Sequence, residues 1–133
     1  MSEPSRMYEL VIIGAGPAGI TAAIYAARKK MDFIVVTTSI GGQVTLSSGI
    51  ENYTGFQYIT GEELAAKFQE HLDRYKFEVK MGEVRNVKRE GNLYSVETDV
   101  GTYLGKTVII ATGRKPRELK VPGETEFMSR GVT

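Results

Sequence analysis

The sequence predicts an α/β fold, in which a parallel sheet carries helices and a three-stranded antiparallel β-meander. Three observations predict it: a strand–turn–helix–strand run over residues 7–37, an amphipathic helix leading into another short strand, and an alternating pattern over residues 83–105. The 133 residues suit one ordinary domain rather than two well-separated ones.

The first run is a βαβ unit. Tyr8 to Ile13 is apolar and rich in β-branched residues, as buried parallel strands are. Pro17 suits the first turn of a helix, because its missing N–H costs nothing there. Apolar residues then recur at helical spacing, and the basic residues 28–30 close the helix where cations suit its dipole. Phe33 to Thr37 is a second buried strand, so we expect parallel pairing and a right-handed crossover.

A long loop separates this unit from a second helix. Thr38 to Thr60 shows little periodicity, and a loop of that length is usually functional or disordered. Its aromatic residues argue against disorder. Thr60 and Glu63 have the spacing of a capping box, which predicts a helix starting there. Phe77 to Val79 is expected to add a short third parallel strand.

The second half of the chain predicts antiparallel structure. Glycine-containing turns after residues 88 and 98 separate three short alternating segments, the last of them Thr102 to Leu104. We expect a meander packed on the parallel sheet, followed by a separate buried strand, Lys106 to Ala111. The organisation predicted is therefore a domain over residues 1–113 and a linker over residues 114–133.

Composition limits the function classes. The net charge of +1 gives no electrostatic case for nucleic acid or an anionic membrane as a partner. No apolar run approaches the roughly 20 residues of a membrane span, and residues 1–6 hold no apolar signal core. A cytoplasmic protein is the expectation. With no cysteine and one histidine, the chain offers no dithiol chemistry, and we expect no metal site.

The glycine turn after the first strand is the most specific motif. It reads Gly14, Ala15, Gly16, Pro17, Ala18, Gly19. The first glycine permits a tight turn, the second lets the backbone approach a pyrophosphate, and the third lets helix and strand pack together. The helix start then offers free N–H groups to phosphates. Because a strand precedes the turn and a helix and strand follow it, the motif predicts a dinucleotide site in a Rossmann-like domain.

Three further segments fit around that site. The second strand ends in Thr37 and Thr38, where an acidic residue usually binds the ribose hydroxyls, so the ribose site is neutral. Gly42 and Gln43, together with Asn52, combine a close backbone approach with amides suited to the edge of a heteroaromatic ring. The last strand ends in the small residues Ala111, Thr112 and Gly113, which permit close packing against a ligand.

In this order and spacing, the motifs resemble the thioredoxin reductase family, including the flavoprotein subunit of alkyl hydroperoxide reductase. The resemblance runs from Tyr8 to Thr133 and rests on the strings VIIGAGPAGITAAIYAAR, GGQV, IENYTGF, VIIATG and VPGETEF. It implies an FAD-binding domain, an NADPH domain and a Cys-x-x-Cys pair in the intact protein. It also implies a thioredoxin-like or peroxiredoxin-like disulfide protein as partner.

The resemblance assigns roles by position. Residues 14–19 would hold the FAD pyrophosphate, and Thr37 or Thr38 would lie at the adenosine ribose. Gly42, Gln43 and Asn52 would face the ribityl chain and the isoalloxazine ring. Glu83 and Val84 would lie at the adenine, and residues 111–113 would line the strand end near the cofactor. We expect no catalytic residue in this chain, because the flavin carries the redox chemistry.

The chain also departs from the family. Many relatives have an acidic ribose ligand that is missing here, and the NADPH domain, the Cys-x-x-Cys segment and a later return segment lie outside these 133 residues. We therefore expect the N-terminal part of an FAD domain, incomplete relative to the family's full domain, without disulfide reductase activity of its own. An exposed sheet edge predicts self-association into a homo-oligomer.

Two other hypotheses stay open at this point. One is a non-catalytic nucleotide-binding module that holds only the adenosine end of a ligand. The other is part of a cysteine-free flavoprotein similar to ferredoxin–NADP reductases, which the absence of cysteine permits.

Overall fold

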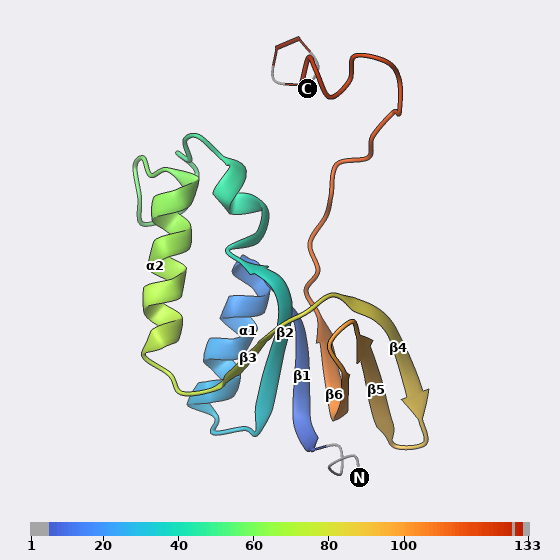
Figure 1. Ribbon diagram of the computed structural model, residues 1–133. Helices are drawn as coiled ribbons and strands as arrows, with labels where there is room; N and C mark the ends of the chain where they lie inside the picture. The colour runs from blue at the N-terminus through green and yellow to red at the C-terminus, as the bar shows by residue number, and fades with distance from the viewer. Residues whose placement is uncertain (1–5, 129, 132–133) are drawn as a thin grey trace.

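A mixed sheet in the strand order β3-β2-β1-β6-β5-β4 forms the middle of the molecule (Figure 1). The computed structural model describes residues 6–128 and 130–131. The expectations about residues 1–5 and the linker positions 129 and 132–133 fall outside that part. The elements within it are β1 (Met7–Ala15), α1 (Pro17–Arg28), β2 (Phe33–Ile40), the 3-10 helix η1 (Gly42–Leu46), α2 (Gly61–Asp73), β3 (Glu78–Met81), β4 (Val84–Glu90), β5 (Leu93–Thr98) and β6 (Thr102–Ile110).

The predicted βαβ unit is confirmed. β1 pairs in parallel with β2, and β2 pairs in parallel with β3, while α1 and α2 lie on one face of the sheet (Figure 1). Because successive side chains of a strand point to opposite faces, Ile12 and Val35 face the helices. There they form a core with Ile20 and Ala23 of α1 and with Leu72 of α2.

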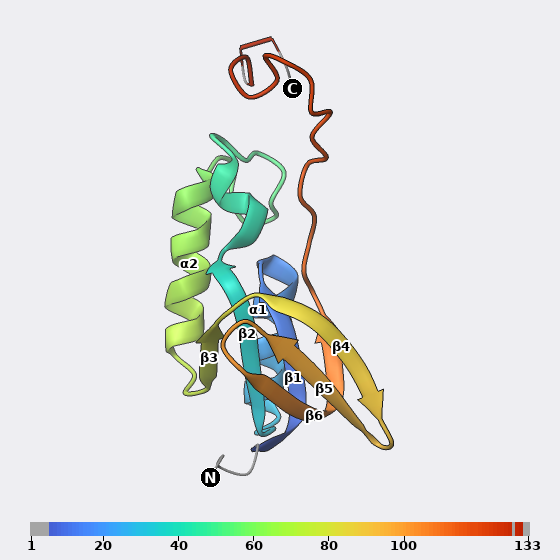
Figure 2. The same ribbon diagram turned by 45° about the vertical axis from the view of Figure 1, so that its right-hand side comes forward.

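The opposite face of the sheet is covered by the meander, as the alternating pattern predicts. β4, β5 and the first half of β6 curl across it (Figure 2). Val96 of β5 is fully buried in a second core, packed with Val11 and Ile34 of the central strands. Val84 and Val87 of β4 add to this core from the edge.

The prediction of two separate segments, Thr102 to Leu104 and Lys106 to Ala111, is wrong. They form one strand, β6, which pairs antiparallel with β5 and parallel with β1. The intervening Gly105 is opposite both Tyr8 and Tyr94, and a Cβ there would lie 2.8 Å from Val11 Cγ2. The glycine thus serves close strand packing rather than a turn.

The prediction that the end of β6 is buried is also wrong. Ile109 is 39% exposed and Ile110 is 68% exposed. The reason is that β5 pairs with β6 only from Thr102 to Gly105, so the remaining residues of β6 have β1 as their one neighbouring strand within the described residues.

The long loop between residues 38 and 60 is more regular than its sequence indicates. β2 continues to Ile40, η1 follows, and an antiparallel bridge joins Ile50 to Ile59. The capping box of α2 is confirmed: the Glu63 N–H donates to Thr60 Oγ1 at 3.2 Å, and the Thr60 N–H donates to Glu63 Oε2 at 2.9 Å. The N–H and hydroxyl groups of Thr60 lower the pKa of the Glu63 carboxyl, because they donate to its charged form.

The segment predicted as a linker leaves the sheet beyond β6, and its residues 122–127 form a block of turns (Figure 1). Glu124 is buried at the centre of this block, where its carboxylate accepts the N–H groups of Leu119 and Lys120 at 2.8 and 2.7 Å. The division into a domain and a linker stays a prediction. None of the helices in the described residues has both the length and the apolar character to cross a bilayer.

Candidate functional site

A cavity of about 570 Å³ opens at the carboxyl ends of β1, β2 and β6. This volume falls within the roughly 300–1,000 Å³ of small-molecule and cofactor sites. From β1 the chain passes through α1 to β2 on one side, while β6 lies on the other side, so the strand order reverses between β1 and β6. Ligands of open α/β sheets bind outside the carboxyl ends of the strands at such a reversal.

The glycine turn forms the floor of this cavity. Gly14 has a φ of +101°, and a Cβ there would overlap the carbonyl group of Ala111. A Cβ on Gly19 would overlap the carbonyl oxygen of Gly14, so this residue allows α1 to pack closely on the strand end. Gly16 differs, because its nearest neighbour would be the Gly42 Cα at 3.9 Å. Gly16 thus faces open space, whereas a Cβ on Gly42 would lie 3.0 Å from the Gly16 Cα and crowd the turn.

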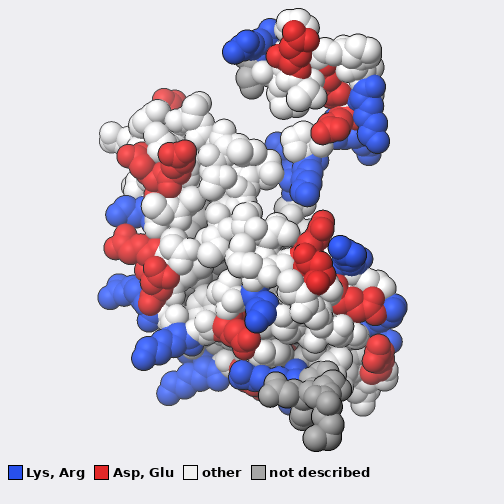
Figure 3. Space-filling model, viewed as in Figure 1, with Lys and Arg blue, Asp and Glu red and all other residues white. Residues whose placement is uncertain are grey.

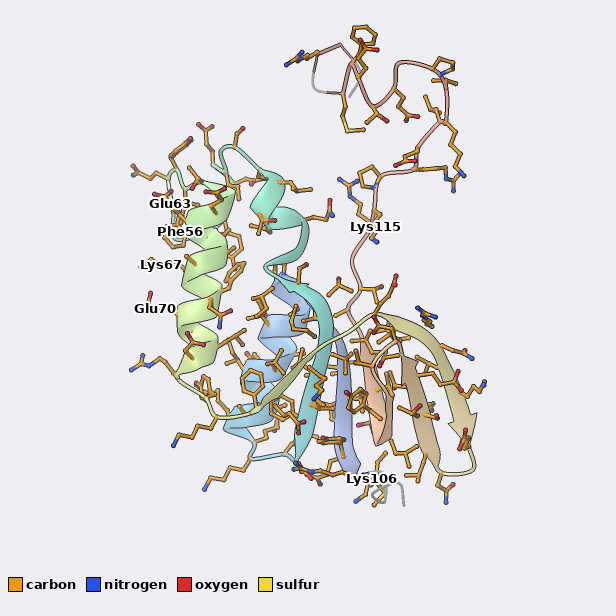
Figure 4. All side chains as sticks on the ribbon, in the orientation of Figure 1. Phe56, Glu63, Lys67, Glu70, Lys106 and Lys115 are labelled. Atoms are coloured by element: carbon orange, nitrogen blue, oxygen red, sulfur yellow. The ribbon has the colours of Figure 1, made fainter. Side chains whose placement is uncertain are left out.

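The start of α1 opens into the cavity without a cap. No side chain hydrogen-bonds to it, and its first turn holds no acidic residue. The start of α2 is closed by its capping box, with Glu63 at that end of the helix (Figure 4). The unpaired N–H groups and positive end of a helix dipole attract anions such as phosphate. The first turn of α1 can therefore hold a phosphate.

The two threonines at the end of β2 are not equivalent. Thr37 is buried, and its hydroxyl donates to the Ser39 carbonyl at 2.7 Å. The same oxygen accepts the N–H groups of Ala15 at 3.2 Å and Ser39 at 3.3 Å. A hydroxyl has one donor and two acceptor sites, so that of Thr37 is fully used. Thr38 is exposed and lines the cavity, so of the two threonines it is the one whose hydroxyl is available to a ligand.

Hydrogen bonds fix the remaining walls. The Gly82 N–H donates to the Thr37 carbonyl at 2.9 Å, so residues 82–84 lie beside the end of β2. The Ala111 N–H donates to the Ile13 carbonyl at 2.8 Å, which holds residues 111–113 beside the glycine turn. The segment after β6 then carries Lys115 upward past the cavity (Figure 4).

The cavity brings together all but two of the residues predicted from the sequence. Those that line it are Gly14, Ala15, Gly16, Pro17, Ala18, Thr37, Thr38, Gly42, Gln43, Glu83, Val84, Ala111, Thr112 and Gly113. Gly19 lies behind the turn, where it is buried, and Asn52 lies exposed on the loop between Ile50 and Ile59.

The sequence reasoning missed several residues that line the cavity. Val44, Thr45 and Leu46 continue the 3-10 helix that the Gly-Gly-Gln motif begins, and Arg114 and Lys115 follow Ala-Thr-Gly directly. Because these residues directly follow two of the motifs, their position in the sequence could have indicated that they line the cavity. The other missed residues are Ile13, Val36, Ser39 and Gly82.

Three ionisable side chains line the cavity within the described residues. They are Glu83, Arg114 and Lys115. The surface between η1 and the segment after β6 is mostly uncharged, and charges gather along the outer side of α2 and on the C-terminal segment (Figure 3). No group of three side chains suited to a metal ion occurs in the residues that the structure describes.

A glycine turn, an uncapped helix start and a cavity at a strand-order reversal define a Rossmann-like nucleotide-binding domain. Comparison with known families makes the assignment more specific. The sequence model of the pyridine nucleotide-disulphide oxidoreductase family matches residues 8–133. The chain belongs to this family.

Similar proteins place the chain within it. Thioredoxin reductase of Bacillus subtilis is 38% identical over 134 residues, which cover 100% of this chain and 42% of that protein. The bifunctional thioredoxin reductase/thioredoxin of Mycobacterium leprae is 42% identical over 135 residues, which cover 99% of this chain and 30% of that protein. The solved thioredoxin reductase of Streptococcus pyogenes has a TM-score of 0.84 at 44% identity, covering 96% of this chain and 42% of that one.

The chain thus spans about two fifths of the length of thioredoxin reductases that it matches, 42% in the Bacillus subtilis case. It is thioredoxin reductase-like and corresponds to the N-terminal portion of the family.

Proposed function

We propose that this chain is the FAD-binding portion of a thioredoxin reductase-like oxidoreductase, and that its cavity holds FAD with the adenosine diphosphate half at the glycine turn. The observation that carries the proposal is the uncapped start of α1, which opens with the glycine turn into a cavity. The family of the chain supports the choice of FAD.

The residues present fit this group. Gly16 leaves space that a side chain would fill, since a Cβ there would meet no atom closer than 3.9 Å. At Gly42 a side chain would crowd the turn, since its Cβ would lie 3.0 Å from the Gly16 Cα. The N–H groups of Gly16 and Ala18, which line the cavity, would donate to the pyrophosphate. Thr38 and residues 82–84 would hold the adenosine, with the Gln43 amide directed toward the flavin side.

When bound, FAD supplies the redox chemistry by which the whole protein would carry electrons from NADPH to a disulfide. The residues described here bind and orient it. The chain has no cysteine, so we propose that it does not reduce disulfides by itself. A thioredoxin-like or peroxiredoxin-like substrate protein, the homo-oligomeric state and the cytoplasmic location stay predictions.

Titration of the 133-residue chain with FAD and with ADP, followed by calorimetry, tests the proposal. We expect saturable binding of both. Gly16→Val, which fills the space at the turn, should abolish it, whereas the control Ala22→Val on α1 should bind as the wild type does. A wild-type chain that binds neither nucleotide at millimolar concentration would contradict the proposal. Turnover of a disulfide substrate with NADPH would contradict the inactivity of the chain alone.

A non-catalytic module that recognises only the adenosine end is the second candidate. The position of Asn52 favours it, because this predicted flavin-side residue does not line the cavity. Equal affinities for FAD and ADP would support this candidate. FAD affinity clearly above that for ADP would show that the flavin half is also bound, and would favour the first.

A further inference from the structure

The end of β2 lacks the carboxylate that usually accepts hydrogen bonds from the ribose hydroxyls. Thr37, Thr38 and Ser39 stand there instead, and the Thr37 hydroxyl is committed to internal hydrogen bonds. A neutral hydroxyl is a weaker acceptor than a carboxylate. If the cavity recognises a ribose through an acid, that acid must come from another element.

Glu83 is the one acidic residue among those lining the cavity in the described part of the chain. It follows Gly82, whose N–H donates to the carbonyl of Thr37 at 2.9 Å. The connection between β3 and β4 therefore places Glu83 next to the strand end at which Rossmann-like folds bind ribose.

The main chain of Glu83 is fixed while its side chain is free. Its N–H donates to Asp99 Oδ1 at 2.8 Å, and its carbonyl accepts the Asp99 N–H at 3.2 Å. No described residue donates a hydrogen bond to its carboxylate or forms an ion pair with it. The backbone thus holds Glu83 in place, and its carboxylate is free to accept hydrogen bonds from a ligand.

We propose that the Glu83 carboxylate accepts hydrogen bonds from the adenosine ribose hydroxyls, in place of the acid missing from β2. This assignment rests on the proposed function. It gives Glu83 a role at the ribose, whereas the family resemblance implies one at the adenine. The same carboxylate would repel a 2′-phosphate, so the site selects a nucleotide with free ribose hydroxyls.

Calorimetric titration of ADP and 2′,3′-dideoxy-ADP into the wild type and Glu83→Gln tests the assignment. Hydrogen bonds to a charged group change affinity by about tenfold or more. The wild type should prefer ADP by about that factor, and Glu83→Gln should lose the preference by weakening ADP binding alone. Glu90→Gln, at the far end of β4, is the matched control and should keep the preference.

Each other outcome overturns the assignment. If Glu83→Gln still prefers ADP, the ribose hydroxyls bind elsewhere. If Glu83→Gln loses affinity for ADP and the dideoxy form equally, Glu83 acts through the negative charge of its carboxylate or through the local backbone, and not through hydrogen bonds to the ribose. A wild type that binds ADP without any preference over the dideoxy form refutes the assignment and leaves the proposed function standing. A wild type that binds no nucleotide refutes both.

Discussion

Replacing Gly19 by alanine would test how α1 meets the sheet. In most helices this change is stabilising, because alanine has the higher helix propensity by about 1 kcal/mol. Here the added Cβ would overlap the carbonyl oxygen of Gly14, which is backbone and cannot rotate away. We therefore expect Gly19→Ala to destabilise the protein.

The expected loss follows from the packing around this contact. To reach van der Waals separation, the start of α1 would have to move by about 1.5 Å, and a gap of even 1 Å forfeits up to half of each dispersion contact. Ile20 and Ala23, only 3% and 1% exposed, would lose contacts with the sheet. Overpacking of this kind typically costs about 1–3 kcal/mol, so the propensity gain is outweighed.

Urea unfolding followed by far-ultraviolet circular dichroism measures this loss. Gly16→Ala is the matched control, since a Cβ there has no neighbour closer than 3.9 Å and the residue has a negative φ of −77°. We expect its stability to stay within about 0.5 kcal/mol of the wild type. If Gly19→Ala were as stable as the wild type or more so, the close packing of α1 on the turn would not be a constraint.

Three other predictions concern capping, ionisation and association. Thr60→Ala should cost about 1 kcal/mol of unfolding free energy by removing the helix cap. The lowered pKa of the Glu63 carboxyl also contributes stability that is lost as the pH falls. In urea unfolding between pH 6 and pH 3, the variant should therefore lose less stability than the wild type. Burial and the hydrogen bond donated to Glu78 raise the pKa of Tyr8 to about 12, so this tyrosine contributes stability below its unfolded pKa of 10.0 that is lost as pH rises toward 12. Tyr8→Phe should flatten that alkaline loss of stability, and an unchanged pH dependence would contradict the assignment. The exposed Ile110 should promote self-association, so Ile110→Lys should shift sedimentation toward the monomer, and a monomeric wild type at high concentration would contradict this.

The parts of the fold that were predictable from the sequence depend on local chemistry. The capping box of Thr60 and Glu63 needs only two side chains and the backbone between them, and it is present as predicted. The glycine turn is also local, because its sterics involve the strand and helix that it joins. The break predicted between Leu104 and Lys106 is wrong because the residue that requires Gly105, Val11, is distant in the sequence. A glycine required by a neighbouring strand looks the same in the sequence as a glycine required by a turn.

The cavity shows the same limit. Most residues that line the cavity belong to the sequence motifs. The motifs place small residues where strands end, and such positions can be recognised from the sequence alone. The hydroxyl of Thr37 was not separable from that of Thr38 by sequence, since its commitment depends on the Ala15 N–H from a neighbouring strand. The exposure of Ile110 likewise depends on how far β5 runs beside β6, which no local pattern encodes.

The starts of α1 and α2 meet the same physical requirement in different ways. Each helix begins with N–H groups that need acceptors. α2 supplies acceptors from its own side chains, and its start is closed. α1 begins with Gly16 and Pro17, which offer no side-chain acceptor, and its first turn faces a cavity. A helix start left uncapped in water gains little from its dipole, whereas a phosphate bound there satisfies the N–H groups and the positive end together. The missing cap at Gly16 therefore supports the proposal that a pyrophosphate binds at the start of α1.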